Sequence, residues 1–344
     1  EARERQLTLF DVDEVEYGTR IGAVYLEPLG FFTPLLRTQF DALAADLPDL
    51  PIDVLKDADV RKKSWNTVTP AATLAVKASD DWLRRLHLDS GLWYATYSEG
   101  FTAGGFEPRG PELVPFEPEE LKNYEIGMKL DALDSRLRFN AALYYMDYTN
   151  IQVRVAEQGA RISDLFLFLS NAAKATVKGA EIETTLLLGD AVLTASATYT
   201  DATYGDYLTT IVIPGQGQST ADRSSEPFFM VPEFSWSLGA QYNLLTPIGM
   251  LVPRIGMYAR DEVFTGYDYL AASYESSTLD DLTLWNARLS YIPGERLRVT
   301  AYVDNLTNER YFRSGFSLSA LLGSATLVQG QERTMGIELT YEFF

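Results

Sequence analysis

Hydrophobic and polar residues alternate one by one over long stretches of this 344-residue chain. The last stretch, Thr334 to Phe344, shows the pattern most clearly. Its apolar face consists of Met335, Ile337, Leu339, Tyr341 and Phe343. A period of two indicates a β-strand that lies between two different surroundings. Such a terminal strand is typical of a membrane β-barrel, where it faces lipid, and the alternative is a sandwich strand covered by a second sheet.

Eleven further stretches alternate in the same way, and we predict that each is a strand. They are Glu16 to Glu27, Ser64 to Ala78, Leu88 to Gly100, Leu121 to Asp131, Arg136 to Tyr148, Thr176 to Leu188, Ala191 to Asp201, Glu233 to Asn243, Leu251 to Asp261, Leu282 to Ile292 and Leu297 to Leu306. Arg5 to Val12 is a weaker candidate. The stretches have about 10 to 13 residues each. That length exceeds the roughly 5 or 6 residues usual in soluble proteins and suits a tilted strand that crosses a bilayer in about 9 to 11.

The second face of these strands carries charges. Charged or amide side chains lie in mid-strand at Lys129, Arg138, Glu181, Glu183, Gln241, Arg254, Arg288 and Arg298. A charge in a packed core is costly unless it is paired, whereas a water-filled barrel interior accepts it. Because the chain has no run of 18 or more apolar residues, a membrane-spanning form has to use strands.

The connections between the predicted strands alternate between short and long. The short ones are Ala132 to Ser135, Gly189 to Asp190, Leu244 to Met250 and Pro293 to Arg296, with Ser79 to His87 slightly longer; the long ones are Pro28 to Lys63, Gly110 to Glu120, Thr149 to Ala175, Ala202 to Pro232, Glu262 to Asp281 and Thr307 to Arg333. Long irregular loops are unusual in compact soluble domains. We therefore predict an all-β fold: a transmembrane antiparallel β-barrel with short periplasmic turns and long extracellular loops.

The beginning of the chain differs from the rest. Leu35 to Leu47 has hydrophobic residues at helical spacing and is followed by prolines, which predicts a short amphipathic helix within a loop. The first residue is Glu1, and no basic-then-apolar signal segment follows it. We expect a mature or partial product whose N-terminal portion is missing.

Composition narrows the possible functions. The absence of cysteine excludes disulfides, thiolate metal sites and cysteine nucleophiles. A net charge of −19 argues against nucleic acid as a partner, because phosphate binding needs a basic surface. With 20 tyrosines and 18 phenylalanines, the chain is rich in aromatic residues for a soluble domain.

Enzymatic chemistry has little support in the sequence. The single histidine, His87, lies in a predicted turn, and a Ser–His–Asp site would require a nucleophile beside it. Paired carboxylates such as Asp57/Asp59, Asp80/Asp81 and Asp280/Asp281 would bind Ca²⁺ weakly or remain solvated in loops and turns. We interpret His87 and these carboxylates as solvated groups, and we expect no catalytic residue, no metal site and no cofactor. A barrel hydrolase that uses His87 remains a minor alternative.

Four segments carry a resemblance to a known family. They are Tyr97-Ser98-Glu99-Gly100-Phe101 with Gly104-Gly105-Phe106; Pro118-Glu119 with Asn123-Tyr124-Glu125-Ile126-Gly127-Met128-Lys129; Asn171-Ala172-Ala173-Lys174-Ala175 with Lys178-Gly179-Ala180-Glu181-Ile182-Glu183; and Asp304-Asn305-Leu306-Thr307-Asn308-Glu309-Arg310-Tyr311. In this order, together with the terminal aromatic strand, they resemble the C-terminal part of the barrel of TonB-dependent outer-membrane receptors of the ferric-siderophore type. The resemblance covers about Ser64 to Phe344.

These motifs also have a physical interpretation. Gly104 and Gly105 permit a positive φ and a sharp bend at a strand end. Gly179, just inside a strand, predicts a bulge or a close approach of the backbone. Asp304 and Asn305 are expected to end a strand and to start a turn by bonding their own backbone. They identify the family without marking a substrate.

The resemblance implies a location, a function and a set of partners. It implies the outer membrane of a Gram-negative bacterium, contact with outer-membrane lipid, and TonB-energised uptake of an iron-siderophore-like ligand. It implies the TonB–ExbB–ExbD system and the barrel-assembly machinery as partners, with Tyr341, Phe343 and Phe344 as the assembly signal. Such receptors have a plug inside a 22-stranded barrel, so residues 1–344 would supply about 12 strands without the plug. The chain alone should then be incompetent in transport.

Ligand contacts are expected where the long loops meet the barrel interior. The candidates are Arg109, Tyr204, Tyr207, Arg223, Phe228, Phe229, Tyr267, Tyr269, Arg313 and Phe316. Aromatic rings and arginine suit a large anionic chelate that bears catechol or carboxylate groups. The alternative for each aromatic residue is a place in the membrane-interface girdle or in loop packing. For the whole chain, the alternative is a small passive diffusion pore.

Overall fold

The computed structural model describes residues 63–107, 114–158, 165–213, 217–265, 278–318 and 324–343. The chain divides into two compact units, one with residues 69–102 and 119–344 and the other with residues 1–68 and 103–118. The predicted strands Arg5 to Val12 and Glu16 to Glu27, and the predicted helix Leu35 to Leu47, lie outside the described residues.

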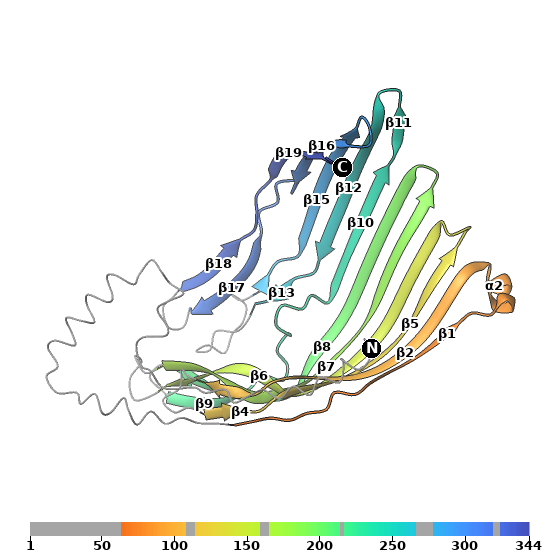
Figure 1. Ribbon diagram of the computed structural model, residues 1–344. Helices are drawn as coiled ribbons and strands as arrows, with labels where there is room; N and C mark the ends of the chain where they lie inside the picture. The colour runs from red at the N-terminus through yellow and green to blue at the C-terminus, as the bar shows by residue number, and fades with distance from the viewer. Residues whose placement is uncertain are drawn as a thin grey trace. The chain divides into compact units, whose positions relative to one another are not determined.

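The larger unit contains a curved antiparallel sheet in which each long strand pairs with the next one along the chain (Figure 1). Its strands are β1 (Ala71–Lys77), β2 (Leu88–Thr102), β5 (Glu119–Ala132), β6 (Leu137–Gln158), β7 (Leu165–Leu188), β8 (Ala191–Ile213), β10 (Phe234–Tyr242), β12 (Gly249–Arg260), β15 (Leu282–Ile292), β16 (Leu297–Asp304) and β19 (Thr334–Tyr341). All predicted strands from Ser64 onward are thereby confirmed. The described path is open, with β1 at one edge and β19 at the other.

The strand register separates two faces of this sheet. Tyr97, Tyr124 and Tyr145 lie opposite one another on β2, β5 and β6, and the apolar residues two positions away follow the same face. Exposed residues on this apolar face include Leu74, Ile126, Leu143, Ile182, Leu238 and Ile337. The other face carries Glu125, Glu183, Arg254 and Arg298. So much exposed apolar area would be a liability in water and suits contact with lipid.

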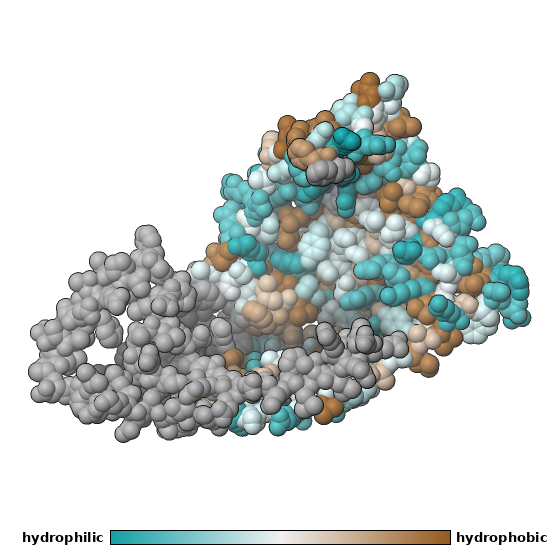
Figure 2. Space-filling model, viewed as in Figure 1, coloured by the Kyte–Doolittle hydropathy of each residue, from teal (hydrophilic) through white to brown (hydrophobic). Residues whose placement is uncertain are grey.

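At one end of the sheet the connections are short. The connection between β10 and β12 is a hairpin that includes β11 (Leu244–Thr246), and Ile248 at its tip is 71% exposed. Figure 2 shows hydrophobic residues gathered at the end of the sheet where β11 and the C-terminus lie. Apolar side chains at strand ends are expected near a membrane interface.

The connection between β1 and β2 contains a helix that the sequence analysis had assigned to a turn. Helix α2 (Asp80–Leu86) has aspartates in its first turn and arginines in its last, which suits the helix dipole. Trp82 packs edge-on against Trp93 of the apolar face, with ring centroids 6.0 Å apart. His87 ends the helix in the left-handed conformation, at φ 55°. Among the described residues, no helix is both long and apolar enough to cross a membrane.

At the opposite end the connections are long, as predicted, and parts of them continue as β-hairpins. Strands β6 and β7 pair from Leu137–Leu186 out to Gln158–Leu165, and β8 continues to pair with β9 (Gly217–Asp222). Two short pairs follow: β13 (Val263–Phe264) with β14 (Thr278–Leu279), and β17 (Phe312–Leu318) with β18 (Ser324–Gln329). Pairing satisfies the backbone N–H and C=O groups that an irregular loop would leave exposed.

In the smaller unit, β3 (Gly105–Glu107) pairs with β4 (Val114–Phe116). Trp65 is buried, lies 6.5 Å from Phe106 between ring centroids, and donates a hydrogen bond to Glu117. Gly104 and Gly105 do not use the positive φ that glycine permits. These glycines are needed for space instead, because a Cβ at either position would collide with Trp65 or Phe116.

The other two motif predictions are confirmed. Gly179 lies opposite Tyr144, and a Cβ there would collide with that ring and with the backbone of β8. Asn305 ends β16 with φ 53° and is 5% exposed. Its side chain accepts a hydrogen bond from the Glu309 N–H at 2.8 Å and donates to the carbonyls of Glu309 and Gln331.

Candidate functional site

Four of the predicted ligand residues come together beyond the membrane-facing part of the sheet. Tyr204 and Tyr207 lie on the extension of β8, and their ring centroids are 4.8 Å apart. Phe228 stacks on Tyr204 at 4.6 Å. Tyr207 is only 1% exposed, and it packs with Ile151 of β6. The aromatic residues therefore form a small hydrophobic core between the extended hairpins.

Arg223 fastens the segment after β9 to this core. Its backbone N–H donates to the carbonyl of Tyr207 at 2.8 Å, and its guanidinium forms an ion pair with Glu226 at 2.5 Å. The two side chains are 3% and 11% exposed. The Tyr207 N–H donates to the hydroxyl of Ser224 at 2.9 Å. A buried, hydrogen-bonded ion pair fixes one arrangement of the segment, because either charge alone would be costly there.

Burial also sets the protonation of this cluster. Burial raises the pKa of the Glu226 carboxyl above its usual range, although the Arg223 guanidinium opposes the shift. Burial and the nearby Glu226 raise the pKa of Tyr204 to about 12. The Tyr204 phenol therefore stays protonated near neutral pH, and it offers a neutral hydroxyl instead of an anionic ligand atom.

The remaining predicted ligand residues are more scattered. Arg313 is exposed on β17, and Phe229 is 56% exposed beside Phe264, with which it forms an isolated β-bridge. Arg109, Tyr267 and Tyr269 lie outside the described residues, as does the side chain of Phe316.

A groove of about 830 Å³ opens beside Phe228, and the sequence analysis missed most of its lining. It is lined by Tyr199, Thr200, Asp201, Ala202, Pro227, Phe228, Val231, Glu233, Asp261, Glu262, Phe264, Thr278 and Asp281. Asp201 pairs with Lys178 at 3.1 Å, whereas the other carboxylates have no ion-pair partner among the described residues. The sequence signal that could have located this groove is a set of acidic residues at or beside the ends of four predicted strands.

The lining of the groove is acidic, with five carboxylates. Among the described residues, no three Asp, Glu or His side chains are placed to hold a metal ion. Carboxylates beside the rings of Phe228 and Phe264 suit hydrogen-bond donors or positive charge on a ligand with an apolar body.

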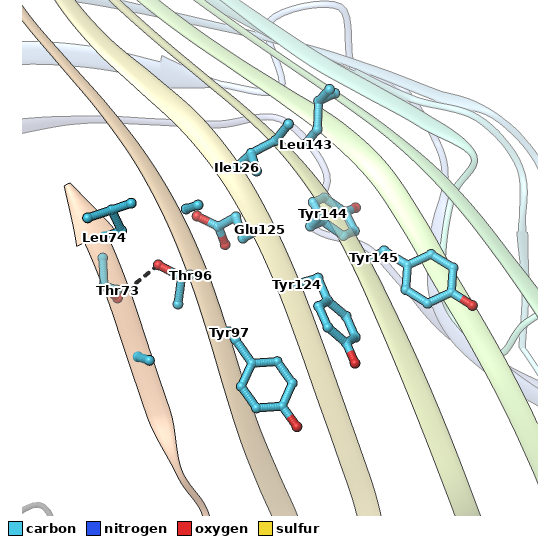
Figure 3. A pocket seen from close by; sticks show the side chains of 12 residues that line it. Thr73, Leu74, Thr96, Tyr97, Tyr124, Glu125, Ile126, Leu143, Tyr144 and Tyr145 are labelled. Atoms are coloured by element: carbon cyan, nitrogen blue, oxygen red, sulfur yellow. Dashed lines mark hydrogen bonds between the residues drawn. The ribbon is translucent and has the colours of Figure 1, made fainter. Parts of the chain in front are cut away.

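A second hollow lies on the membrane-facing side, among β1, β2, β5 and β6 (Figure 3). Figure 3 shows Tyr97, Tyr124 and Tyr145 in a row from three strands, and neighbouring ring centroids are 5.1 and 6.3 Å apart. Leu74 and Ile126 lie on the same apolar face. A row of tyrosines on that face is typical of the aromatic belt at a membrane interface, so we do not interpret this hollow as a ligand site.

Two other predictions concern the ends of strands. Tyr341 and Phe343 are exposed on the apolar face and contact each other at 5.1 Å between ring centroids, while Phe344 lies outside the described residues.

His87 lines a hollow with Asp80, Arg84, Asp89 and Asp134, and no serine or threonine lines that hollow.

The family follows from comparison with known proteins. Residues 37–306 match the model of the family described as TonB dependent receptor-like, beta-barrel. The chain belongs to this family. Its members reside in the outer membrane of Gram-negative bacteria and act in transport, not as enzymes, which confirms the predicted location and the expectation of no enzyme.

The similarity between this chain and its relatives lies in the barrel portion. The pesticin receptors of Yersinia enterocolitica and Yersinia pestis are each 25% identical over 260 residues, or 73% of this chain. The chain spans about a third (34%) of their length. The ferric yersiniabactin uptake receptor of Yersinia pestis superimposes with a TM-score of 0.61 at 19% identity over 83% of this chain and 39% of that one. A siderophore receptor of Acinetobacter baumannii gives 0.62, at 19% identity over 83% and 37%. These structures support the barrel fold.

Proposed function

We propose that this chain forms the C-terminal part of the barrel wall of a receptor that takes up a ferric chelate, energised by TonB. The observation that carries the proposal is the two-faced sheet, which has one apolar, exposed face and one charged face along strands long enough to cross a membrane. The relatives support the ligand class, because their names refer to ferric yersiniabactin and to siderophores.

In this proposal the strands supply the channel wall, and the extended hairpins supply the outer ligand surface. Tyr207 and Arg223 hold the hairpins in place, because both are buried. Phe228, the acidic groove and Arg313 contact the ligand, with Arg109, Tyr267 and Tyr269 contributing from the remainder of the chain. A plug and a TonB-engaging segment from the rest of the receptor, the ExbB–ExbD complex and the barrel-assembly machinery complete the system.

The acidic groove changes the expected ligand chemistry. An anionic chelate would be repelled by Glu233, Asp261 and Glu262, which have no described ion-pair partner. A neutral or cationic chelate that donates hydrogen bonds from hydroxyl or amine groups fits the groove better. We therefore favour a chelate of that charge over the anionic catechol or carboxylate type.

Uptake of radioactive iron tests the proposal. Cells without their own ferric-chelate receptors are given the complete receptor that contains this barrel, and a neutral hydroxamate chelate is compared with an anionic catecholate one. We expect uptake that depends on TonB and favours the neutral chelate, and cells that make only these 344 residues should show none. Replacing Asp261 and Glu262 by Asn and Gln should reduce the preference, whereas Asp134→Asn, at the short-turn end, should not. Uptake without TonB would contradict the proposal.

The alternative function, a passive diffusion pore, requires that the sheet close into a barrel. A pore requires closure, and β1 and β19 do not pair with each other in the described part of the chain. Conductance in planar bilayers separates the two functions, because a closed pore passes ions steadily.

A further inference from the structure

Three arginines gather on the charged face of the C-terminal strands. Arg254 of β12, Arg288 of β15 and Arg298 of β16 line one groove of about 340 Å³. The groove lies toward the short-turn end, since Asn243 and Ile292 also line it. It belongs neither to the aromatic cluster nor to the acidic groove described above.

The strand register places like charges together. Arg254 is directly opposite Arg288 across the β12–β15 ladder. Like charges at such positions repel and destabilise a sheet. The whole chain has a net charge of −19, so three arginines in one groove are unusual for this molecule. A local arrangement that lowers stability is expected where a surface binds a ligand.

The groove has an excess of positive charge. Arg288 pairs loosely with Asp304 at 3.7 Å and lies over the ring of Tyr302 at 5.6 Å. Within the described part of the chain, Arg254 and Arg298 have no ion-pair partner, although Glu338 also lines the groove. With Glu338 and Asp304 both counted against the three arginines, one positive charge remains.

The groove also offers neutral hydrogen-bonding groups. The hydroxyls of Ser290 and Thr300 bond each other at 2.8 Å across β15 and β16. Thr340 and the amide of Gln241 line the groove as well. Guanidinium groups bind carboxylate and phosphate oxygens in pairs, and neighbouring hydroxyls supply further donors.

We infer that this groove is a binding site for a small solute that carries two or more carboxylate or phosphate groups. Each of Arg254 and Arg298 binds one oxyanion, and Arg288 contributes charge from its place above Tyr302. The size of the groove suits a small molecule. The inference goes beyond the proposed function, because it concerns the channel wall and does not depend on the ligand surface.

Titration calorimetry on the full chain, purified in detergent, tests the site with tricarballylate as the probe. We expect saturable binding to the unchanged chain. Arg254→Gln and Arg298→Gln should each weaken it roughly ten-fold, because each removes a charge-assisted hydrogen-bond pair. Arg298→Lys keeps the charge but loses the paired geometry, so it should weaken binding less. The matched control is Lys129→Gln, which removes an exposed cation from β5 on the same charged face.

Two results would overturn the inference: no saturable heat with the unchanged chain, or equal loss of binding in Lys129→Gln and in the arginine variants. If the arginine variants fail to fold, a second titration uses the unchanged chain alone. Inorganic pyrophosphate must then displace tricarballylate, and simultaneous independent binding contradicts a single oxyanion site. This experiment measures binding of a solute and not iron uptake. A negative result would therefore contradict the oxyanion site without contradicting the proposed function.

Discussion

The membrane-facing strands and the extended hairpins of the same sheet are stabilised differently. In the strands, apolar side chains point outward and stay exposed, as Ile337 does at 77%. In the hairpins, side chains pack on one another, so that Tyr207 is 1% and Ala175 is 2% exposed. Strand pairing and lipid account for the first region, and a packed core accounts for the second. A change of the same size should therefore have different consequences in the two regions.

Removing the ring at the centre of the hairpin core should have the largest effect. Tyr207→Ala leaves a cavity among Ile151, Ala173 and Ala175, and we expect a local loss of about 3–5 kcal/mol. Hydrogen exchange of the β8–β9 hairpin would measure it, with the membrane-facing strands unchanged. Leu208→Ala, at a neighbouring residue that is 59% exposed, is the control. Equal protection in both variants would mean that the hairpin has no core of its own.

A charge on the lipid-facing side should have the next largest effect. Ile182→Arg on β7 places a cation against hydrocarbon, which costs about 2–4 kcal/mol near the middle of a bilayer. The neighbouring residue Glu183 faces the other way, so Glu183→Arg should change the unfolding free energy by less than about 0.5 kcal/mol. Reversible unfolding in lipid vesicles measures both. Similar costs would contradict the assignment of the two faces.

A smaller loss is expected where β16 ends. Asn305→Ala removes a buried side chain that bonds the backbone of Glu309 and Gln331, and it leaves a left-handed residue without its compensation. We expect a cost of about 1–3 kcal/mol in unfolding free energy, since buried backbone groups lose their partners. Asn308→Ala, at an exposed position with the same sign of φ, removes a single hydrogen bond, from the Arg333 N–H, and should cost less. If both substitutions have the same effect, the burial of Asn305 and its additional hydrogen bonds do not decide the stability of this turn.

The two regions also differ in how far the sequence predicts them. Period-two alternation located the membrane-facing strands because lipid and water impose a different residue type on each face. The hairpins lack this alternation of residue types. Their pairing and the contact of Tyr204 with Phe228 arise from interactions between segments that are distant in the sequence, so the alternation could not predict them. The acidic groove was missed for the same reason, because Asp201, Asp261 and Asp281 converge only once three connections have folded. Gly104 was recognised as a special position from the sequence, but the physical reason is different. A side chain there would collide with its neighbours, and φ does not require glycine.

The smallest predicted effect is a pH dependence confined to the hairpins. Burial raises the pKa of Glu226, so its charged form is less favourable in the folded hairpin than in the unfolded chain. Its contribution to stability is therefore fully present below the unfolded pKa and is lost as the pH rises through the higher folded pKa. Proteolysis of the segment after β9 should accelerate over that range. Glu226→Gln resembles the protonated carboxyl, so it should match the unchanged chain at low pH, and its proteolysis rate should not change as the pH rises. A pH slope that survives the substitution would place the titrating group elsewhere, and a matching slope in the membrane-facing strands would show that the two regions unfold as one.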